Sequence, residues 1–444
     1  MKLFKSDSAR TTAIYKNVVA SFFLKGCSAG IALLMVPLTL TCLGEYKNGV
    51  WLTISSMLVW IDQMDIGLGN GLRNKLAACI AHNHMEEARH VVSSTILMLI
   101  CIIVPLTVLL CLLILITDVF SFFNVDPAII PDLRFALLSA VILVCMTFVF
   151  KVVGNIYMGL QLPAVSNMIL VVGQAIALVS TWLLLQNGSA TFYNIVIVNT
   201  LAPLAVYLTA YMATFYKYHS ELRPSLKCAN WDSALELGNL GIKFFWLQIA
   251  GIIQFMTANI LISKFFTPEM VTPYQIAYRY MSLVIVAFTV ICMPFWNATT
   301  DAYERKDYEW IRRANQKMNL MTMAMALLLV VMVILSPWVY DVWIGDKCDV
   351  PFSMTAMMAL YVFLLVLSMR YSYFLNGIGA LRLQLYMTTV TVFYIPLAWL
   401  VSKETGDILW LMIVMCLCIA PSIFVNMIQF HKILHGKAKG LWRI

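Results

Sequence analysis

The amino-acid sequence predicts an all-α polytopic membrane protein, with twelve transmembrane helices in two six-helix lobes around a central cavity. The composition, the lengths of the apolar segments and the placement of the basic residues lead to this fold class. Hydrophobic residues make up 61% of the 444 residues and charged residues 12%, whereas soluble domains contain roughly 45–50% and 25%. A soluble core cannot bury that much apolar surface, so the chain is expected to lie in a bilayer.

Twelve apolar segments follow one another along the chain, and each is longer than the ~20 residues that a helix needs to cross the hydrocarbon core. They cover residues 18–42, 49–70, 91–116, 133–156, 164–186, 193–216, 239–262, 273–300, 317–343, 351–375, 382–402 and 408–430. An even number of crossings places both termini on the same side of the membrane.

The basic residues indicate which side this is. The tails and loops on the side of the termini hold 20 Lys and Arg residues, and the opposite loops hold 5. Because short cytoplasmic loops are enriched in Lys and Arg, both termini are expected in the cytoplasm. The net charge of +8 reflects this asymmetry and is spread over short loops, so no nucleic-acid partner is expected.

The longest polar connection falls near the middle of the chain and divides it into two halves. The expected organisation is an N-terminal six-helix lobe (1–216), a cytoplasmic linker (217–238), a C-terminal six-helix lobe (239–430) and a basic cytoplasmic tail (431–444). The halves also resemble each other, since Lys151 and Gly159 recur as Arg370 and Gly377 about half the chain later. This pattern favours duplication, with parallel repeats related by an axis along the membrane normal.

Five basic residues fall inside the predicted spans, where a cation at a helix centre costs about 2.5–3.5 kcal/mol. These are Lys25, Lys151, Lys243, Arg279 and Arg370. Lys151, Lys243 and Arg370 lie within about five residues of a cytoplasmic end, so their side chains either extend to the interface or face water. Lys25 and Arg279 lie farther from an interface, and both are expected to face an aqueous cavity.

The stretch 60–76 at the end of the second apolar segment combines carboxylates, glycines and cations. Asp62 and Asp65 are one helical turn apart on the same face, and three glycines follow, which allow close packing or a bend. Arg73 and Lys75 are then expected in a short basic loop on the cytoplasmic side.

The motifs of several other classes of protein are missing from the sequence. There is no phosphate-binding glycine loop, no zinc-spaced His/Glu pair and no nucleophile elbow, so we expect neither an enzyme nor a bound cofactor or metal. A drug-cation exporter needs buried carboxylates, but residues 18–42 and 239–262 contain neither Asp nor Glu. Cations in the spans with few acids instead suit an anionic cargo, such as a lipid-linked diphosphate.

Two runs carry a resemblance to a known family. Residues 43–51 (LGEYKNGVW) and 65–76 (DIGLGNGLRNKL) resemble the corresponding parts of Wzx-type O-antigen and polysaccharide flippases, which belong to the multidrug/oligosaccharidyl-lipid/polysaccharide exporter superfamily. The resemblance covers roughly residues 10–90; beyond them it rests on the number of spans, the two halves and the loop lengths.

This resemblance implies a flippase that moves polyprenyl-diphosphate-linked oligosaccharide repeat units across the bacterial inner membrane by alternating access, for O-antigen or capsule synthesis. The implied partners are the lipid-linked oligosaccharide, membrane lipids and the polysaccharide polymerase machinery. Two alternatives stay open: a lipid II-type flippase and a small-molecule multidrug exporter of the same superfamily.

The expected substrate site is cationic. Lys25 and Arg279 are expected to attract the diphosphate from a cavity between the lobes, with Lys151, Lys243 and Arg370 as a cytoplasm-facing basic rim. Two roles stay open for Asp62 and Asp65. They either pair with Arg73 or neighbouring helices, or couple transport to protons, as the resemblance implies.

Overall fold

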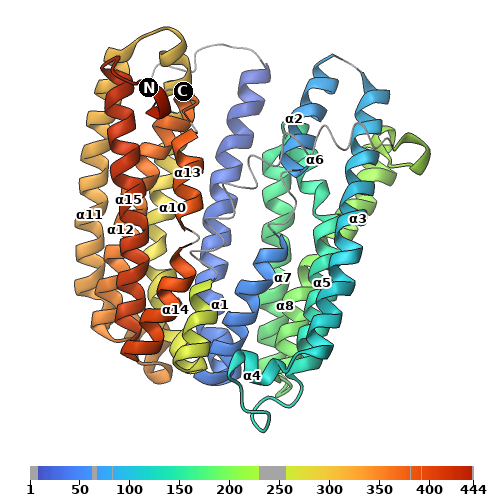
Figure 1. Ribbon diagram of the computed structural model, residues 1–444. Helices are drawn as coiled ribbons and strands as arrows, with labels where there is room; N and C mark the ends of the chain where they lie inside the picture. The colour runs from blue at the N-terminus through green and yellow to red at the C-terminus, as the bar shows by residue number, and fades with distance from the viewer. Residues whose placement is uncertain are drawn as a thin grey trace. The chain divides into compact units, whose positions relative to one another are not determined.

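The computed structural model describes residues 9–62, 68–82, 84–229, 257–380, 382–391 and 393–442 (Figure 1). Nearly all of these residues are helical, and no strand occurs among them. The chain divides into two compact units, Met1–Phe245 (unit 1) and Trp246–Ile444 (unit 2). The predicted all-α polytopic membrane fold is confirmed, whereas the predicted cavity would lie between the units and stays a prediction.

Unit 1 contains the six predicted passes. Its helices are α1 (Ala9–Asp62), α2 (Leu68–Ala81), α3 (Met85–Ile116), the short α4 (Val119–Phe123), α5 (Leu133–Phe150), α6 (Val152–Gly159), α7 (Pro163–Gln186) and α8 (Phe192–Ala213). Gly44 divides α1 into two passes, because its backbone has φ 68° and ψ 175°. Glycine adopts this left-handed region without a steric penalty, so one residue suffices to end the first helix and begin the second.

Unit 2 contains five described passes and the end of a sixth. Residues 257–265 are helical, and the rest of the predicted span 239–262 lies outside the described residues. The other helices are α10 (Pro268–Glu304), α11 (Tyr308–Ile344), α12 (Phe352–Ile378), α13 (Arg382–Thr391), α14 (Tyr394–Thr405) and α15 (Ile408–Leu434). Across the described parts of both units, eight helices are long and apolar enough to cross a membrane.

Several helices are longer than the apolar segments predict, because they continue into polar sequence beyond the hydrocarbon core. The basic loop predicted around Arg73 and Lys75 is wrong: both residues lie on α2, which runs to Ala81. Similarly, α10 begins at Pro268, and Pro is favoured in the first turn of a helix, where its missing N–H costs no hydrogen bond. Hydropathy locates the part of a helix that lies in lipid, but not the turns that extend into water.

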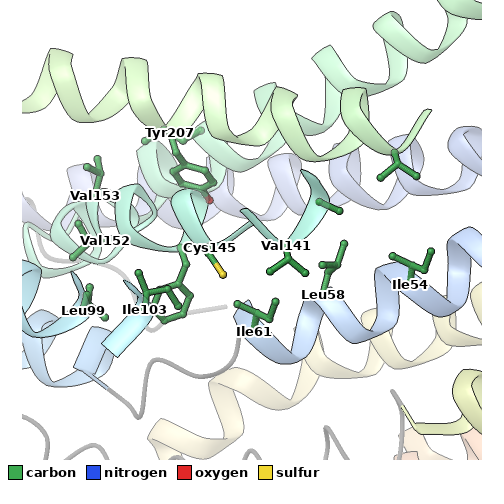
Figure 2. Packing of buried hydrophobic residues seen from close by; sticks show 14 of the residues in the cluster. Ile54, Leu58, Ile61, Leu99, Ile103, Val141, Cys145, Val152, Val153 and Tyr207 are labelled. Atoms are coloured by element: carbon green, nitrogen blue, oxygen red, sulfur yellow. The ribbon is translucent and has the colours of Figure 1, made fainter. Parts of the chain in front are cut away.

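The core of unit 1 is built from apolar side chains of helices that are distant in the sequence (Figure 2). Ile54, Leu58 and Ile61 of α1 are spaced by three or four residues, and they face Val141 and Cys145 of α5. Leu and Ile residues of α3 and Tyr207 of α8 complete the same cluster. This spacing places one stripe of α1 against its neighbours.

In both units the second and fourth passes pack closely against each other, at a glycine near the end of the fourth pass. A Cβ atom at Gly159 in α6 would lie 3.1 Å from the Arg73 carbonyl oxygen of α2. In unit 2, a Cβ atom at Gly377 in α12 would lie 2.9 Å from the Trp296 carbonyl oxygen of α10. The repeated contact supports the predicted duplication, since Gly159 and Gly377 also correspond in the sequence.

Candidate functional site

Five of the eight predicted site residues have described side chains: Lys25, Arg73, Lys151, Arg279 and Arg370. Asp62 is the last residue of α1, and its side chain lies outside the described part of the structure, as do Asp65 and Lys243. Their predicted roles therefore stay predictions.

Lys25 lies on the first pass of α1, and its side chain is exposed. The nearby apolar residues Phe23 and Leu34 are 72% and 60% exposed, and at ~100° per residue they lie on the opposite side of the helix. One turn after Lys25, the Ser28 hydroxyl donates a 2.7 Å hydrogen bond to Gln174 Oε1 on α7. Lys25 therefore lies near the polar contact between α1 and α7, and the exposed apolar residues Phe23 and Leu34 lie on the opposite side of α1.

Arg279 lies on α10 of unit 2, and its side chain is partly buried. Because α10 begins at Pro268 and not at the predicted Pro273, Arg279 is ~16 Å along the helix from its start. One turn earlier on the same face, Gln275 Nε2 donates a 2.7 Å hydrogen bond to Asn259 Oδ1 in the helical segment 257–265. Arg279 is thus farther from the start of its helix than the sequence predicts and, like Lys25, lies one turn from a side-chain hydrogen bond to another helix.

Lys151 lies where the fourth pass of unit 1 changes from α5 to α6. It is the last residue before α6, and its side chain is partly buried. The fourth pass of unit 1 is therefore interrupted at Lys151. The corresponding residue of unit 2, Arg370, lies within the continuous helix α12. The sequence correspondence does not extend to the local backbone.

Arg370 is only 5% exposed. Its Nη1 donates to Asn319 Oδ1 at 2.8 Å, and its Nη2 donates to Asn315 Oδ1 at 2.6 Å and to the Asn315 carbonyl oxygen at 3.4 Å. The guanidinium also lies 4.8 Å from the centre of the Tyr371 ring. Two amides of α11 thus supply the bonds that water supplies at a surface, and the predicted position at a cytoplasm-facing rim stays a prediction. A role in substrate binding stays a prediction.

The sequence reasoning missed these amides. Asn315 and Asn319 are four residues apart on α11, so they lie on one face and can bind a single guanidinium from α12. The spacing of two asparagines near the end of an apolar helix was the available signal. Their partner could not be read from it, because Arg370 is more than fifty residues away in the sequence.

Arg73 is exposed on α2, and its carbonyl oxygen forms part of the close contact at Gly159. The described structure thus gives Arg73 a backbone role in holding α6 against α2. Pairing of its side chain with Asp62 or Asp65 involves side chains outside the described residues and stays a prediction.

Acidic residues are absent from the middle of the described helices. Each Asp or Glu in them lies within about one turn of a helix end or of the kink at Gly44: Glu45, Asp62, Glu86, Glu87, Glu269, Asp301, Glu304, Glu309, Asp341 and Glu404. Four ion pairs are formed among the described residues, and all involve exposed or loop side chains of this kind. No group of three or more His, Cys, Asp or Glu side chains that could hold a metal ion occurs in the described ranges. In the central turns of the described helices, the charged residues are thus Lys and Arg.

The fold is that of a known class of transporter. An inward-facing conformation of a multidrug resistance MATE family transporter of the MOP superfamily has a TM-score of 0.79 with this chain, covers 93% of it and 96% of its own length, and is 16% identical. An outward-facing conformation of a MATE family transporter has a TM-score of 0.64, covers 96% of each chain and is also 16% identical. At this identity the likeness shows the fold, and it agrees with the superfamily that the sequence resembles. No protein-family model matches the chain.

One curated protein shares a local sequence match. It carries the name "Putative O-antigen transporter" and comes from Salmonella typhimurium strain LT2; 69 residues are 32% identical. The match spans 16% of each chain, so it covers only a small part of that protein. The fold and this local match confirm the resemblance to the superfamily, and both kinds of similar protein are transporters.

Proposed function

We propose that the protein is a flippase that moves polyprenyl-diphosphate-linked oligosaccharide repeat units across the bacterial inner membrane by alternating access, with both termini in the cytoplasm. The cargo serves the synthesis of a surface polysaccharide, either O-antigen or capsule. On this proposal the flippase hands its cargo to a polysaccharide polymerase on the outer side.

The charge distribution carries this proposal. Lys25 and Arg279 lie on membrane helices near polar interhelical contacts, while the acids of the described helices lie at helix ends. A diphosphate that leaves the headgroup region loses its hydration, and it needs cations and hydrogen-bond donors in return. Cations in a region of low dielectric attract such an anion much more strongly than surface cations do.

Each cation has a distinct part in the proposed mechanism. Lys25 of unit 1 and Arg279 of unit 2 are the proposed cationic partners of the diphosphate, and Lys151, Lys243 and Arg370 guide it from the cytoplasmic side. Arg370 has to exchange at least one amide partner to do so, since Asn315 and Asn319 occupy both terminal nitrogens of its guanidinium. The amide contacts near Lys25 and Arg279 offer further donors for sugar hydroxyls.

The local match to the Salmonella protein supports the lipid-linked oligosaccharide as cargo, because O-antigen is built from such units. The MATE fold supports a second candidate, the export of small molecules. The absence of Asp and Glu from the central turns of the described helices disfavours cationic drugs. A lipid II-type flippase shares the cationic requirement, so the two flippase proposals differ only in the sugar and peptide that the diphosphate carries.

Two measurements test the function. Deletion of the gene should abolish the surface polysaccharide while its lipid-linked precursor accumulates in the inner membrane, and sensitivity to cationic drugs should not change. The purified protein in liposomes should move a fluorescent polyprenyl-diphosphate oligosaccharide between leaflets. Intact polysaccharide together with altered drug sensitivity would instead establish the small-molecule exporter.

A further inference from the structure

The segment that follows α8 is folded onto unit 1. Residues 214–229 (the post-α8 segment) form a π-helical turn, Thr214–Tyr218, and two short 3₁₀ turns, Ser220–Leu222 and Leu226–Cys228. This segment includes residues 217–229 of the predicted linker 217–238, and these residues are packed against unit 1.

Three long-range hydrogen bonds hold the segment to the first turns of α3. Arg89 Nε donates to the Arg223 carbonyl oxygen at 2.9 Å, and the Ser225 N–H donates to Ser93 Oγ at 3.1 Å. His90 Nδ1 lies 2.6 Å from the Cys228 carbonyl oxygen and donates to it. These bonds satisfy backbone groups of an irregular segment and set its position relative to α3.

The segment lies over the lipid-facing side of α3. His90 shares a helix face with Cys101, Val104 and Val108, since the intervals of 11, 14 and 18 residues are close to whole turns. Cys101 is exposed, and Val104 and Val108 are 54% and 55% exposed in a stretch of α3 with very high apolarity. In Figure 1 the yellow-green segment projects sideways next to α3 and does not continue above the beginning of that helix.

The outward side of the segment is apolar and aromatic. Leu226 is 82% exposed, and Tyr216 and Tyr218 are each 61% exposed. The chain places these residues directly after a membrane-spanning helix, so they lie at the depth where the bilayer meets water. Tyr side chains are enriched at that depth, because the ring lies among the acyl ends and the hydroxyl stays hydrated.

Basic side chains accompany the aromatic ones. The Arg223 guanidinium lies 4.4 Å from the centre of the Tyr216 ring, and its Nη2 donates to the Tyr216 hydroxyl at 3.2 Å. The Lys217 ammonium lies 5.6 Å from the centre of the Tyr218 ring, and Lys227 follows Leu226. The one acid of the segment, Glu221, contacts His219 at 3.1 Å.

We infer that the post-α8 segment is a binding surface for anionic phospholipid headgroups of the adjacent leaflet. Leu226 and the two tyrosines enter the interface, and Lys217 and Lys227 contact the phosphates. The location directly after α8 and beside the lipid-facing stripe of α3 identifies lipid as the occupant. The inference does not depend on the cargo of the transporter.

Unit 2 provides a structural contrast. Residues 435–442, which include the 3₁₀ turn Gly440–Trp442, fold back onto α13 and α15, and the Lys432 ammonium lies 3.9 Å from the centre of the Trp442 ring. This tail packs on helices of its own unit, whereas the post-α8 segment lies beside α3. We therefore assign the lipid surface to unit 1.

Site-specific photocross-linking in nanodiscs tests the inference. Leu226 is replaced by p-benzoyl-phenylalanine in the full-length protein, and Glu86, an exposed residue in the first turn of α3, carries the same replacement as the control. Nanodiscs contain phosphatidylcholine alone or mixed with phosphatidylglycerol, and cross-linked lipid is identified by mass spectrometry. We expect several-fold more lipid adduct at position 226 than at 86, and enrichment of phosphatidylglycerol in the mixed discs.

The charge contribution is tested in the same discs with Lys217→Gln and Lys227→Gln combined, which should remove the enrichment of phosphatidylglycerol but leave the adduct itself. Replacement of Tyr218 by the same photoreactive residue repeats the measurement if the variant at 226 does not fold. Equal adduct yields at 226 and 86, cross-links from 226 to a second protein copy, or no preference for phosphatidylglycerol would each overturn the inference.

Discussion

Single residues of the two units show how a cation is accommodated in a membrane protein. Lys25 is exposed on α1, while Arg370 is buried and bound by two asparagines. Arginine suits the buried position, because its planar guanidinium binds two acceptors at once and its charge is retained in most environments. Lysine suits an exposed position at which a mobile anion approaches. The structure therefore accommodates these two cations in different ways.

Lys25→Ala and Arg279→Ala should each reduce polysaccharide export strongly while expression stays near wild type, because the diphosphate loses a cationic partner. Lys25→Arg should retain part of the activity, since the charge remains. Export is measured by complementation of a deletion strain and by flipping in liposomes. Wild-type rates in both alanine variants would contradict the proposed role of these two cations in substrate binding.

Arg370→Lys should lower the thermal stability of the purified protein. A lysine cannot bind Asn315 and Asn319 together, and each lost hydrogen bond to a charged group costs about 1.5–3 kcal/mol. The control is Arg313→Lys on α11, whose 3.5 Å pair with Glu309 is exposed and contributes at most ~1 kcal/mol. The same melting temperature in both variants would show that the buried amide contacts do not stabilise the fold.

Contacts between helices show the internal repeat more clearly than the sequence does. The glycine contact recurs at Gly159 and Gly377. A second pair involves the fifth residue of the third pass: Arg89 of α3 donates to the Arg223 carbonyl oxygen, and Arg312 of α11 donates to the Leu434 carbonyl oxygen at 3.3 Å. In each unit, an arginine near the start of the third pass thus donates a hydrogen bond to a backbone carbonyl group. This carbonyl group lies in the segment after the sixth pass in unit 1 and at the end of the sixth pass in unit 2.

The glycine contacts can be tested by Gly377→Ala and Gly159→Ala. At Gly377 a Cβ atom would lie 2.9 Å from Thr299 Cβ and from the Trp296 carbonyl oxygen, so the helices have to separate and stability should fall. Gly30→Ala on α1 is the matched control, since no atom lies within 4 Å and alanine is favoured over glycine in a helix by ~1 kcal/mol. Melting temperatures compare the three variants, and equal values would contradict the close packing.

The arginine contacts can be tested by Arg89→Gln and Arg312→Gln. Hydrogen exchange should become faster in residues 214–229 for the first variant and in residues 435–442 for the second, because each segment loses a charged hydrogen-bond donor. Arg313→Gln, next to Arg312 on the same helix, should leave both segments unchanged. Unchanged protection in the first two variants would indicate that other contacts hold these segments.

At the scale of the whole molecule, the distribution of basic residues predicts the orientation in the membrane. Reporter fusions after Gly188 and Cys348 should indicate the periplasm, and fusions after Arg223 and His435 should indicate the cytoplasm. Alkaline phosphatase is active only at the first two sites if the prediction holds, and a cytoplasmic reporter only at the last two. The opposite result at more than one site would reverse the orientation.

The sequence by itself determined the all-α membrane fold class and the superfamily resemblance, and it predicted the domain bounds. These properties depend on local composition and on short runs, such as the apolar segments and residues 65–76. A segment of about 20 apolar residues is driven into lipid by its own transfer free energy, whatever its neighbours are.

Only the tertiary structure decided which cations are buried, where the helices end and what holds the segment after α8. Arg370 differs from Lys25 because Asn315 and Asn319 reach it from another helix, and the post-α8 segment is ordered by Arg89, far away in the sequence. The cost of a charge or an unpaired backbone group depends on the partners that packing brings within hydrogen-bond distance. These partners belong to distant segments, so hydropathy along the chain cannot identify them.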